Sequence, residues 1–381
     1  MLIRQLVIAK IARESYNTIN LVIFEAMSKK LKTFLALSII PQYLLVKWLA
    51  KHPDWVEAYY SRGFYPYLAK VFRFVFGWLP FSVGDIFYTI AAVLIIRFLI
   101  LNWRKYLYDT RNFFREVFLV LSLLYFVFHL FWGLNYYRQP IYQTLAIGND
   151  YTTDELLAFT DKLIERSNQL HLQITGNDTV MVNIPYSKKE IYRRTLDGYA
   201  KLAQKHHEFA YSPISLKTSL YSKGLTAMGY GGYLNPFTLE AQVNGEQVDF
   251  KYPTVSCHEQ AHQLGYSAEN EANFVGYLAA INNDDIYFKY SGCIYVLRYC
   301  LGEIKRRDPA LFDVYNSKLN VGIIKNYLEV VNFWKRNKSK AEPVFKQSFN
   351  TFLKANNQKD GIRTYSYVVA LLINYYKTQP F

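Results

Sequence analysis

One stretch of the sequence decides the expected fold: Thr254-Val-Ser-Cys-His258-Glu259-Gln-Ala-His262-Gln-Leu-Gly265. In a helix, His258 and His262 lie on one face, one turn apart, and can bind the same Zn²⁺ ion. Glu259 lies beside them, where a carboxylate can take a proton from a metal-activated water. The chain has only seven histidines. We therefore interpret their spacing here as a catalytic zinc site rather than a chance pattern.

A catalytic zinc site has three protein ligands and one open position, so one more ligand is needed. Gly265 suits the C-cap of the first helix, and Ser267 suits the N-cap of the next. Glu269 and Glu271 then lie in the first turn of the second helix, on different sides of it. We expect Glu269 to be the third ligand, because its side of the helix carries small or polar residues. Glu271 is the reserve ligand, with a role in orienting a ligand histidine as the alternative.

The residues before this stretch alternate between apolar and polar, which predicts a β-hairpin. The predicted strands are Thr238–Val243 and residues 247–252, and Asn244-Gly245 is the turn, since Asn-Gly suits a type I′ turn. The first strand is expected to offer a free edge to an extended peptide. Glu240, on its polar face, is a candidate for binding a substrate amine, and a solvated strand glutamate is the alternative interpretation.

Three apolar segments in the first 140 residues are candidates for transmembrane helices: residues 33–50, 84–103 and 117–137. The third has no Asp, Glu, Lys or Arg from Phe118 to Tyr137. The second is interrupted only by Arg97, whose long side chain can reach the headgroups. A buried core helix is the alternative for this second segment. The lipid bilayer is therefore an expected partner of the chain.

Basic residues beside these segments predict the orientation in the cell (inner) membrane. They precede the first segment and fill the connection between the second and the third: Lys29, Lys30, Lys32, Arg104, Lys105, Arg111 and Arg115. We expect both places to be cytoplasmic, which puts the chain after the third segment outside the cytoplasm. The connection between the first two segments is also basic, which weakens this contrast.

Changes in composition divide the chain into three expected parts. Residues 1–32 form an N-terminal leader without the apolar core of a signal peptide, and Met27 is interpreted as the natural start. Residues 33–148 form the membrane region, and residues 149–381 form a soluble domain. Thr152-Thr-Asp-Glu155 predicts a capping box at the start of that domain, and a basic helix is expected over Lys188–Phe209.

The net charge of +14 comes from 44 Lys and Arg against 30 Asp and Glu. We interpret the basic residues as membrane-proximal or solvated, and we do not predict nucleic acid as a partner. Three cysteines without a CxxC pair exclude a disulfide scaffold and a thiolate zinc site. No glycine-rich phosphate loop is present.

The sequence resembles the DUF3810 family of uncharacterised bacterial membrane proteins. The resemblance rests on HEQAHQLGYSAENEANFVGYLA, GYLNPFTLEAQVN, YFKYSGCIYVL, VEAYYSRGFYPYLAKVFRFVFGWLPFSVGDIFY and FWGLNYYRQP, and spans roughly Trp55 to Arg298. It implies a zinc metallopeptidase-like domain on membrane helices and no particular substrate. Glu269-Asn-Glu271-Ala272-Asn273 is also similar to the ExxA[DN] signature of several gluzincin families, in which the first glutamate binds zinc.

The expected fold is α+β and mostly helical, with transmembrane helices followed by a gluzincin-type domain that has a β-hairpin before the HExxH helix. The expected function is that of a membrane-anchored zinc metallopeptidase acting on a peptide or protein substrate, with Glu259 as the catalytic base. The alternative is a non-catalytic membrane scaffold that retains a zinc site for stability.

Overall fold

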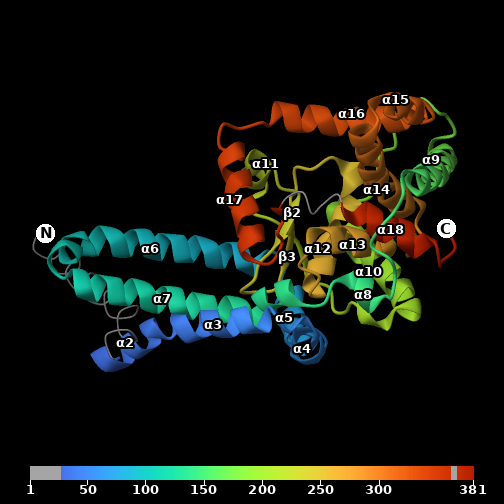
Figure 1. Ribbon diagram of the computed structural model, residues 1–381. Helices are drawn as coiled ribbons and strands as arrows, with labels where there is room; N and C mark the ends of the chain where they lie inside the picture. The colour runs from blue at the N-terminus through green and yellow to red at the C-terminus, as the bar shows by residue number, and fades with distance from the viewer. Residues whose placement is uncertain (1–26, 362–366) are drawn as a thin grey trace, which may run out of the picture. The chain divides into compact units, whose positions relative to one another are not determined.

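The computed structural model of the chain describes residues 27–361 and 367–381 (Figure 1). Within these ranges the protein is mostly helical and contains one three-stranded sheet. The chain forms two compact units. One comprises the chain up to Trp48 and Ala92–His129, and the other comprises Leu49–Ala91 and Leu130–Phe381. The leader up to residue 26, and with it the interpretation of Met27 as the start, lies outside the described residues.

The first unit is built from helices α2 (Lys29–Leu37) and α3 (Ile39–Leu49) and from parts of α6 (Val83–Tyr108) and α7 (Thr110–Phe131). Ser38 separates α2 from α3, and its hydroxyl lies 2.9 Å from the Ser122 hydroxyl of α7. The Gln42 amide donates to both hydroxyls. A small polar cluster therefore joins three otherwise apolar helices.

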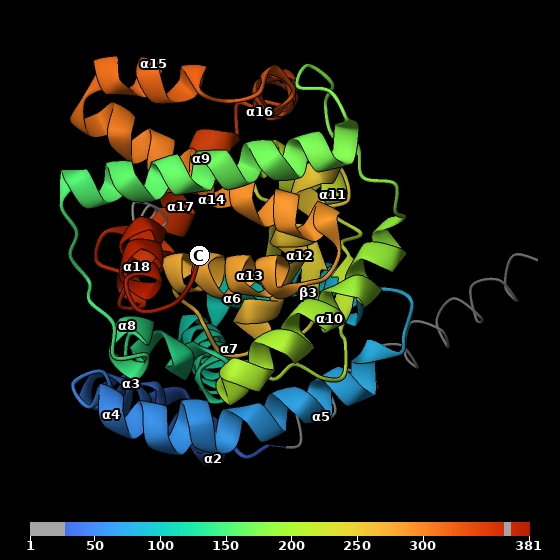
Figure 2. The same ribbon diagram turned by 90° about the vertical axis from the view of Figure 1, so that its right-hand side faces the viewer.

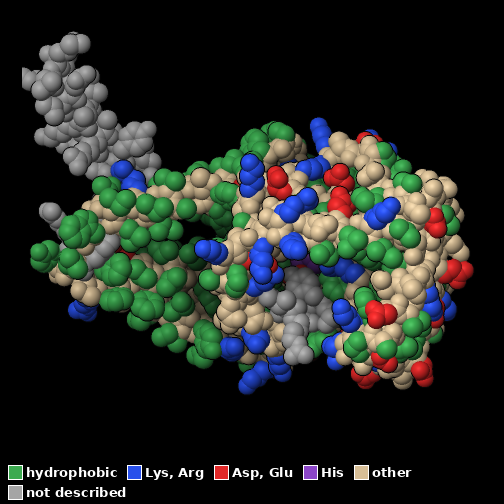
Figure 3. Space-filling model, turned by 90° about the horizontal axis from the view of Figure 1, so that it is seen from above, with side chains coloured by type: hydrophobic (Ala, Val, Ile, Leu, Met, Phe, Trp, Pro, Cys, Tyr) green, Lys and Arg blue, Asp and Glu red, His purple; other side chains and the backbone are tan. Residues whose placement is uncertain are grey.

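Within the described residues, two helices are long and apolar enough to cross a membrane. They cover Val83–Leu101 and Thr110–Phe131, with mean hydropathy values of 2.1 and 1.8. Their large apolar side chains are mostly exposed, and Figure 3 shows apolar side chains gathered over this part of the molecule. The second and third expected segments are thus confirmed as long apolar helices, as a membrane protein requires.

The boundaries of two expected segments need correction. The first expected segment corresponds to α2 and α3, which are interrupted at Ser38. Lys29–Leu49 meets the criteria of length and apolarity for a span only together with Pro53–Gly77, from which it is bent by 96°. The third expected segment corresponds to α7, which ends at Phe131 instead of Tyr137. Gly133–Tyr137 forms the 3₁₀ helix η2. Asn135 explains this end, because it is fully buried and accepts a hydrogen bond from the Ser61 hydroxyl at 2.9 Å. An uncharged run can thus continue past the membrane into a protein interior.

The second unit contains the remaining elements. Its N-terminal part has α4 (Pro53–Trp55), the π-helix η1 (Val56–Phe64) and α5 (Tyr65–Gly77), and α8 (Ile141–Thr144) follows η2. The larger part has α9 (Thr153–Thr175), α10 (Lys188–Lys205), η3 (His207–Phe209), α11 (Ser222–Met228), η4 (Asp249–Lys251), α12 (Tyr252–Gln263), α13 (Glu269–Asn282), α14 (Ile286–Arg307), α15 (Pro309–Ser317), α16 (Val321–Arg336), α17 (Glu342–Ala355) and α18 (Val368–Tyr376). The expected capping box of Thr152 and Glu155 is confirmed, and so is the basic helix from Lys188.

The core of this unit surrounds α12 and α13. Figure 2 shows α13 between α14 on one side and α10 on the other, and both helices pack against it. Every residue of α12 is buried, as are eleven residues of α13. Polar residues on these two helices are therefore held inside the protein, where only specific partners stabilise them.

The three strands are β1 (Leu216–Thr218), β2 (Gly232–Leu234) and β3 (Ala241–Val243), in the order β1-β3-β2. β3 is parallel to β1 and antiparallel to β2. The predicted second strand over residues 247–252 is wrong, because η4 and the start of α12 occupy it. The hairpin before the HExxH helix joins β2 to β3 instead.

Side-chain hydrogen bonds explain this error. The Asn244 amide donates to the Tyr230 carbonyl, and its oxygen accepts from the Glu246 N–H. Neither Asn244 nor Gly245 has the positive φ that a type I′ turn requires. The predicted free edge on the strand ending at Val243 is also wrong, because β3 is the central strand.

Gly276 sets how closely α13 approaches α12. A Cβ atom at this position would lie 2.8 Å from the His258 backbone nitrogen and 2.9 Å from its Cα. Those are backbone atoms, which cannot rotate away as a side chain can. The small residues on this side of α13 therefore allow the two helices to touch, as the sequence predicts.

Gly276→Ala is expected to destabilise the protein by about 1–3 kcal/mol, because the added methyl group forces the two helices apart. Gly302→Ala is the matched control. Gly302 lies in α14, is exposed, and has open space around its Cβ position. Alanine favours a helix there, so this variant is expected to be stabilised by up to about 1 kcal/mol. Thermal unfolding in detergent measures both, and equal effects of the two changes would contradict a tight α12–α13 contact.

Candidate metal centre

The helix that carries the HExxH pattern is held firmly at its C-terminal end. α12 ends at Gln263 with Leu264 as its C-cap, and Gly265 has a φ of 90°, a left-handed conformation that favours glycine. The Gln263 carbonyl accepts hydrogen bonds from the Tyr65 hydroxyl at 3.1 Å and from Arg73 Nη1 at 3.2 Å. The Gly265 carbonyl accepts one from Arg138 Nη1 at 3.1 Å. Two buried cations therefore lie where the helix dipole is negative, which stabilises this end.

His258, His262 and Glu269 come together at the contact between α12 and α13. Glu269 Oε2 lies 3.3 Å from His258 Nε2 and 3.6 Å from His262 Nε2. One ligand atom from each of the three residues lies within 4.8 Å of the other two, and all three residues are buried. The arrangement predicted for Glu269, facing both histidines, is therefore present.

The start of α13 differs from the prediction in one detail. Ala268 is the N-cap residue, and no side chain caps the helix there, so the prediction of Ser267 as the N-cap is wrong. Glu269 is consequently the first helical residue rather than the second. Glu271 still follows Glu269 by two positions, so the two carboxylates still point to different sides of the helix.

Unpaired buried atoms show that these residues suit a cation. Among the described residues, His258 Nδ1, Glu259 Oε2 and Glu269 Oε2 are buried and have no hydrogen-bond partner. His262 Nδ1 lies 2.7 Å from the Tyr266 carbonyl, which can only accept, so Nδ1 carries the proton. When the His262 ring is neutral, its Nε2 atom therefore carries a lone pair, and this atom faces Glu269. Two imidazoles and one carboxylate form the donor set of a catalytic zinc site, and the residues fit this metal.

The charges at this centre favour a cation as well. Burial by itself raises the pKa of Glu269, but His262 and His258 beside it hold that pKa well below its usual range. Burial by itself lowers the pKa of His262, but the Glu269 carboxylate raises it to about 9. Without a metal, a proton on His262 therefore neutralises the buried carboxylate. A divalent cation would take over that role and displace the proton.

Glu259 differs from the three candidate ligands in the pKa of its side chain. Burial raises the pKa of its carboxyl group to about 8, with the nearby charge of Glu269 acting in the same direction and that of His262 opposing it. The side chain lies against β2, where a Cβ on Gly232 would come within 2.4 Å of Glu259 Oε1. A glycine is thus needed at position 232 for the Glu259 side chain to fit. No pattern in the sequence indicates this role of Gly232.

A family model described as "Protein of unknown function (DUF3810)" matches residues 60–373, which is most of the chain. The chain belongs to the DUF3810 family. A search of curated proteins found no match, and a search of solved structures found none either. The family match covers Tyr65, Arg73 and Arg138 as well as the three candidate ligands.

One interpretation of the sequence predicts that Glu271 orients a ligand histidine. In this DUF3810 chain, Glu271 binds the backbone of another helix instead. Its Oε1 accepts a hydrogen bond from the Ile141 N–H at 2.7 Å, at the start of α8. Burial raises the pKa of Glu271 to about 7, although this hydrogen bond and the charge of Arg138 oppose the rise. Glu271 therefore attaches α8 to α13, and it faces away from the histidines.

Glu240 does not have the accessible position expected of a residue that binds a substrate amine. It is fully buried, and its two carboxylate oxygens accept from the N–H groups of Val83 at 3.2 Å and Gly84 at 2.6 Å. A carboxylate at the first N–H groups of α6 stabilises the start of that helix. The role predicted for Glu240 is therefore corrected to a structural one.

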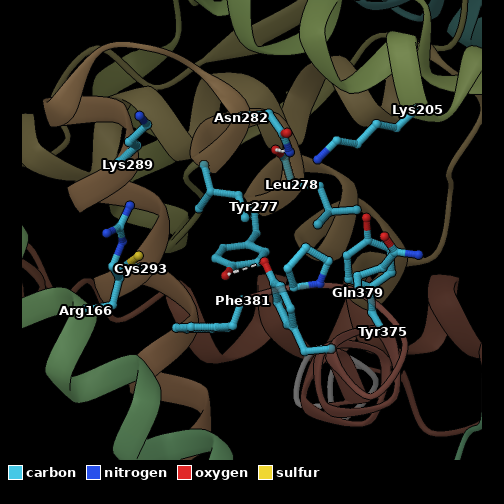
Figure 4. A pocket seen from close by; sticks show the side chains of 13 residues that line it. Arg166, Lys205, Tyr277, Leu278, Asn282, Lys289, Cys293, Tyr375, Gln379 and Phe381 are labelled. Atoms are coloured by element: carbon cyan, nitrogen blue, oxygen red, sulfur yellow. Dashed lines mark hydrogen bonds between the residues drawn. The ribbon is translucent and has the colours of Figure 1, made fainter.

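A separate pocket of about 160 Å³ lies between α9, α13, α14 and α18 (Figure 4). Arg166, Lys205 and Lys289 line it, and the hydroxyls of Tyr277 and Tyr376 lie 3.0 Å apart within it. None of the candidate ligands lines this pocket. It is thus distinct from the candidate metal centre.

Glu269→Gln is expected to lower zinc affinity by more than about 100-fold, because it removes the charged oxygen that faces both histidines. Glu271→Gln removes a carboxylate from the same turn of α13 but keeps the oxygen that accepts from Ile141, so its effect is expected to stay below about tenfold. A competitive titration against a zinc chelator measures both. The opposite ranking would transfer the ligand role to Glu271.

Proposed function

We propose that this DUF3810 chain is a membrane-anchored, zinc-dependent hydrolase, and that it is a metallopeptidase of the gluzincin type. One observation carries the proposal. Two histidines and a glutamate converge in a buried site, and a fourth residue, Glu259, lies beside them with an unpaired carboxylate oxygen. A purely structural zinc site is closed by four protein ligands and has no use for such a group.

The proposed chemistry assigns separate tasks to the zinc and to the protein. Zinc, when bound by His258, His262 and Glu269, supplies a Lewis acid that lowers the pKa of water. Glu259 then takes the proton at Oε2, the oxygen that has no hydrogen-bond partner among the described residues. Because burial raises the pKa of this carboxyl group, the group can hold the proton once it has taken it and return it to the leaving amine.

The order of the strands supports the proposal that an extended peptide substrate binds beside β2. β2 is an outer strand of the sheet, and its Gly232 lies against Glu259. A peptide that paired with β2 would be held by main-chain hydrogen bonds and would pass the proposed base. We therefore propose that the substrate pairs with β2 rather than with the strand expected from the sequence.

We further propose that the protein resides in the cell membrane, with the metal centre outside the cytoplasm. The support is the set of basic residues at the end of α6 and the start of α7, which favours the cytoplasmic side: Arg104, Lys105, Arg111 and Arg115. A cysteine placed at Asn149 in intact cells is then expected to react with a membrane-impermeant maleimide. Protection of that cysteine until the cells are opened would reverse the orientation.

Glu259→Gln is expected to keep zinc while losing hydrolysis by a factor of about 100 or more, because an amide has the shape of the carboxyl group but cannot take the proton. Zinc content and the cleavage of a peptide library, measured on the same preparations, test this. His262→Ala is the control that should lose both zinc and activity.

If the wild-type protein binds zinc and cleaves no peptide in the library, the metallopeptidase proposal fails. A zinc-stabilised membrane scaffold then becomes the better explanation. Equal cleavage by the wild type and by Glu259→Gln would remove Glu259 from the mechanism while leaving the hydrolase itself in place.

A further inference from the structure

Exposed apolar side chains are concentrated in one segment of the second unit. Leu49–Ala91 has twelve large apolar residues that are exposed. The described part of residues 149–381 has thirteen, although it is about five times longer. Soluble surfaces seldom carry such a dense apolar patch, so this segment is expected to have a partner.

The densest part of this patch is a stripe along α5. It consists of Tyr67, Val71, Phe74 and Trp78, whose exposed fractions are 73%, 56%, 75% and 77%. Their spacing of four, three and four residues places them on one side of a helix. We call these four residues the α5 stripe.

The opposite side of α5 is buried in the protein. Tyr65, Ala69 and Arg73 lie about half a turn away from the α5 stripe and are exposed by 5% or less. Tyr65 and Arg73 both donate to the Gln263 carbonyl at the end of α12. These contacts fix the rotation of α5, so the stripe has to face outwards.

We propose that the α5 stripe lies in the headgroup region of the lipid bilayer, with the axis of α5 in the plane of the membrane. Tryptophan and tyrosine prefer this region, because their rings have both an apolar body and a polar group. α5 also ends only five residues before Val83, the first residue of a helix that is long and apolar enough to span the membrane. The proposed surface is therefore continuous in sequence with a membrane segment.

The charges near the stripe match an anionic lipid surface. Lys70 is exposed beside it, and Lys51 and Arg62 are exposed in the preceding residues, whereas Asp54 is the exposed acidic residue of this stretch. Each cation close to an anionic membrane strengthens the attraction to that surface. Amphipathic helices that lie in the interface combine an apolar face with basic residues in the same way.

A different arrangement, in which α5 belongs to a bent transmembrane segment, conflicts with its buried side. Pro53–Gly77 contains Glu57 and Arg73, and both are buried in polar contacts with the protein. Glu57 forms a paired hydrogen bond with Arg138, at 2.9 and 2.8 Å. A spanning α5 would have to take these charges, and the end of α12, into hydrocarbon, which is strongly unfavourable.

The inference does not depend on the proposed hydrolase activity. It does imply that the candidate metal centre is attached to the membrane surface through Arg73 and Tyr65. The helix that carries His258 and His262 is then held at a set distance from the lipid, whatever reaction it supports.

Spin labels on the α5 stripe test this proposal directly. Single cysteines replace Tyr67, Val71, Phe74 and Trp78 in the full chain, which is reconstituted in vesicles that contain anionic lipid. The native Cys257, Cys293 and Cys300 are buried, so labelling of the unsubstituted protein measures the background. Leu328→Cys, on the exposed surface of α16, is the matched control outside the patch. Collision rates with oxygen and with a water-soluble nickel complex report the depth of each label.

An in-plane α5 predicts four similar depths, about 5–10 Å into the boundary between headgroups and acyl chains, and a water-exposed label at residue 328. A spanning α5 predicts that depth changes by about 16 Å from residue 67 to residue 78, at 1.5 Å per residue. That gradient would overturn the proposal. Four water-exposed labels would also overturn it, and so would labels shielded from both reagents, which would indicate a protein partner or a second copy of the chain.

Discussion

The close approach of α12 and α13 at Gly276 is the constraint on which the candidate site depends. A glycine there lets the backbone of α13 touch the backbone of His258, and this brings Glu269 within reach of both histidines. The cost of the arrangement is a buried carboxylate among buried imidazoles, which a protein stabilises only by pairing the charges or by binding a metal. The tightness of the contact and the convergence of three possible metal ligands are thus two consequences of the same packing.

The end of α12 links this site to parts of the chain that are distant in sequence. Arg73 and Tyr65 come from α5, and Arg138 comes from the segment after α7, yet all three bind carbonyls at the end of the HExxH helix. Arg138 also pairs with Glu57, which Arg62 contacts as well. The compact unit around the candidate metal centre therefore includes Leu49–Ala91 and residues 130–148, which the sequence predicts to be part of the membrane region.

Local patterns in the sequence were sufficient to predict which residues meet at the centre of the site. The spacing of His258 and His262, the glycine at 265 and the small residues on one side of α13 each act over one or two helical turns, so they predicted the convergence with Glu269. The turn at Asn244 was mispredicted because the Asn244 side chain binds the Tyr230 carbonyl, a partner fourteen residues away. Glu240 and Glu271 were mispredicted for the same kind of reason, since each binds backbone N–H groups more than a hundred residues distant.

The most direct test of the account is the metal itself. Zinc analysis combined with X-ray absorption at the zinc edge, on protein purified without chelators, reports both stoichiometry and ligands. The account predicts about one zinc per chain, with nitrogen and oxygen ligands at about 2.0–2.2 Å and no sulfur. It also predicts loss of the signal in His262→Ala. A protein that takes up no zinc, or a sulfur ligand at about 2.3 Å, would contradict the central claim.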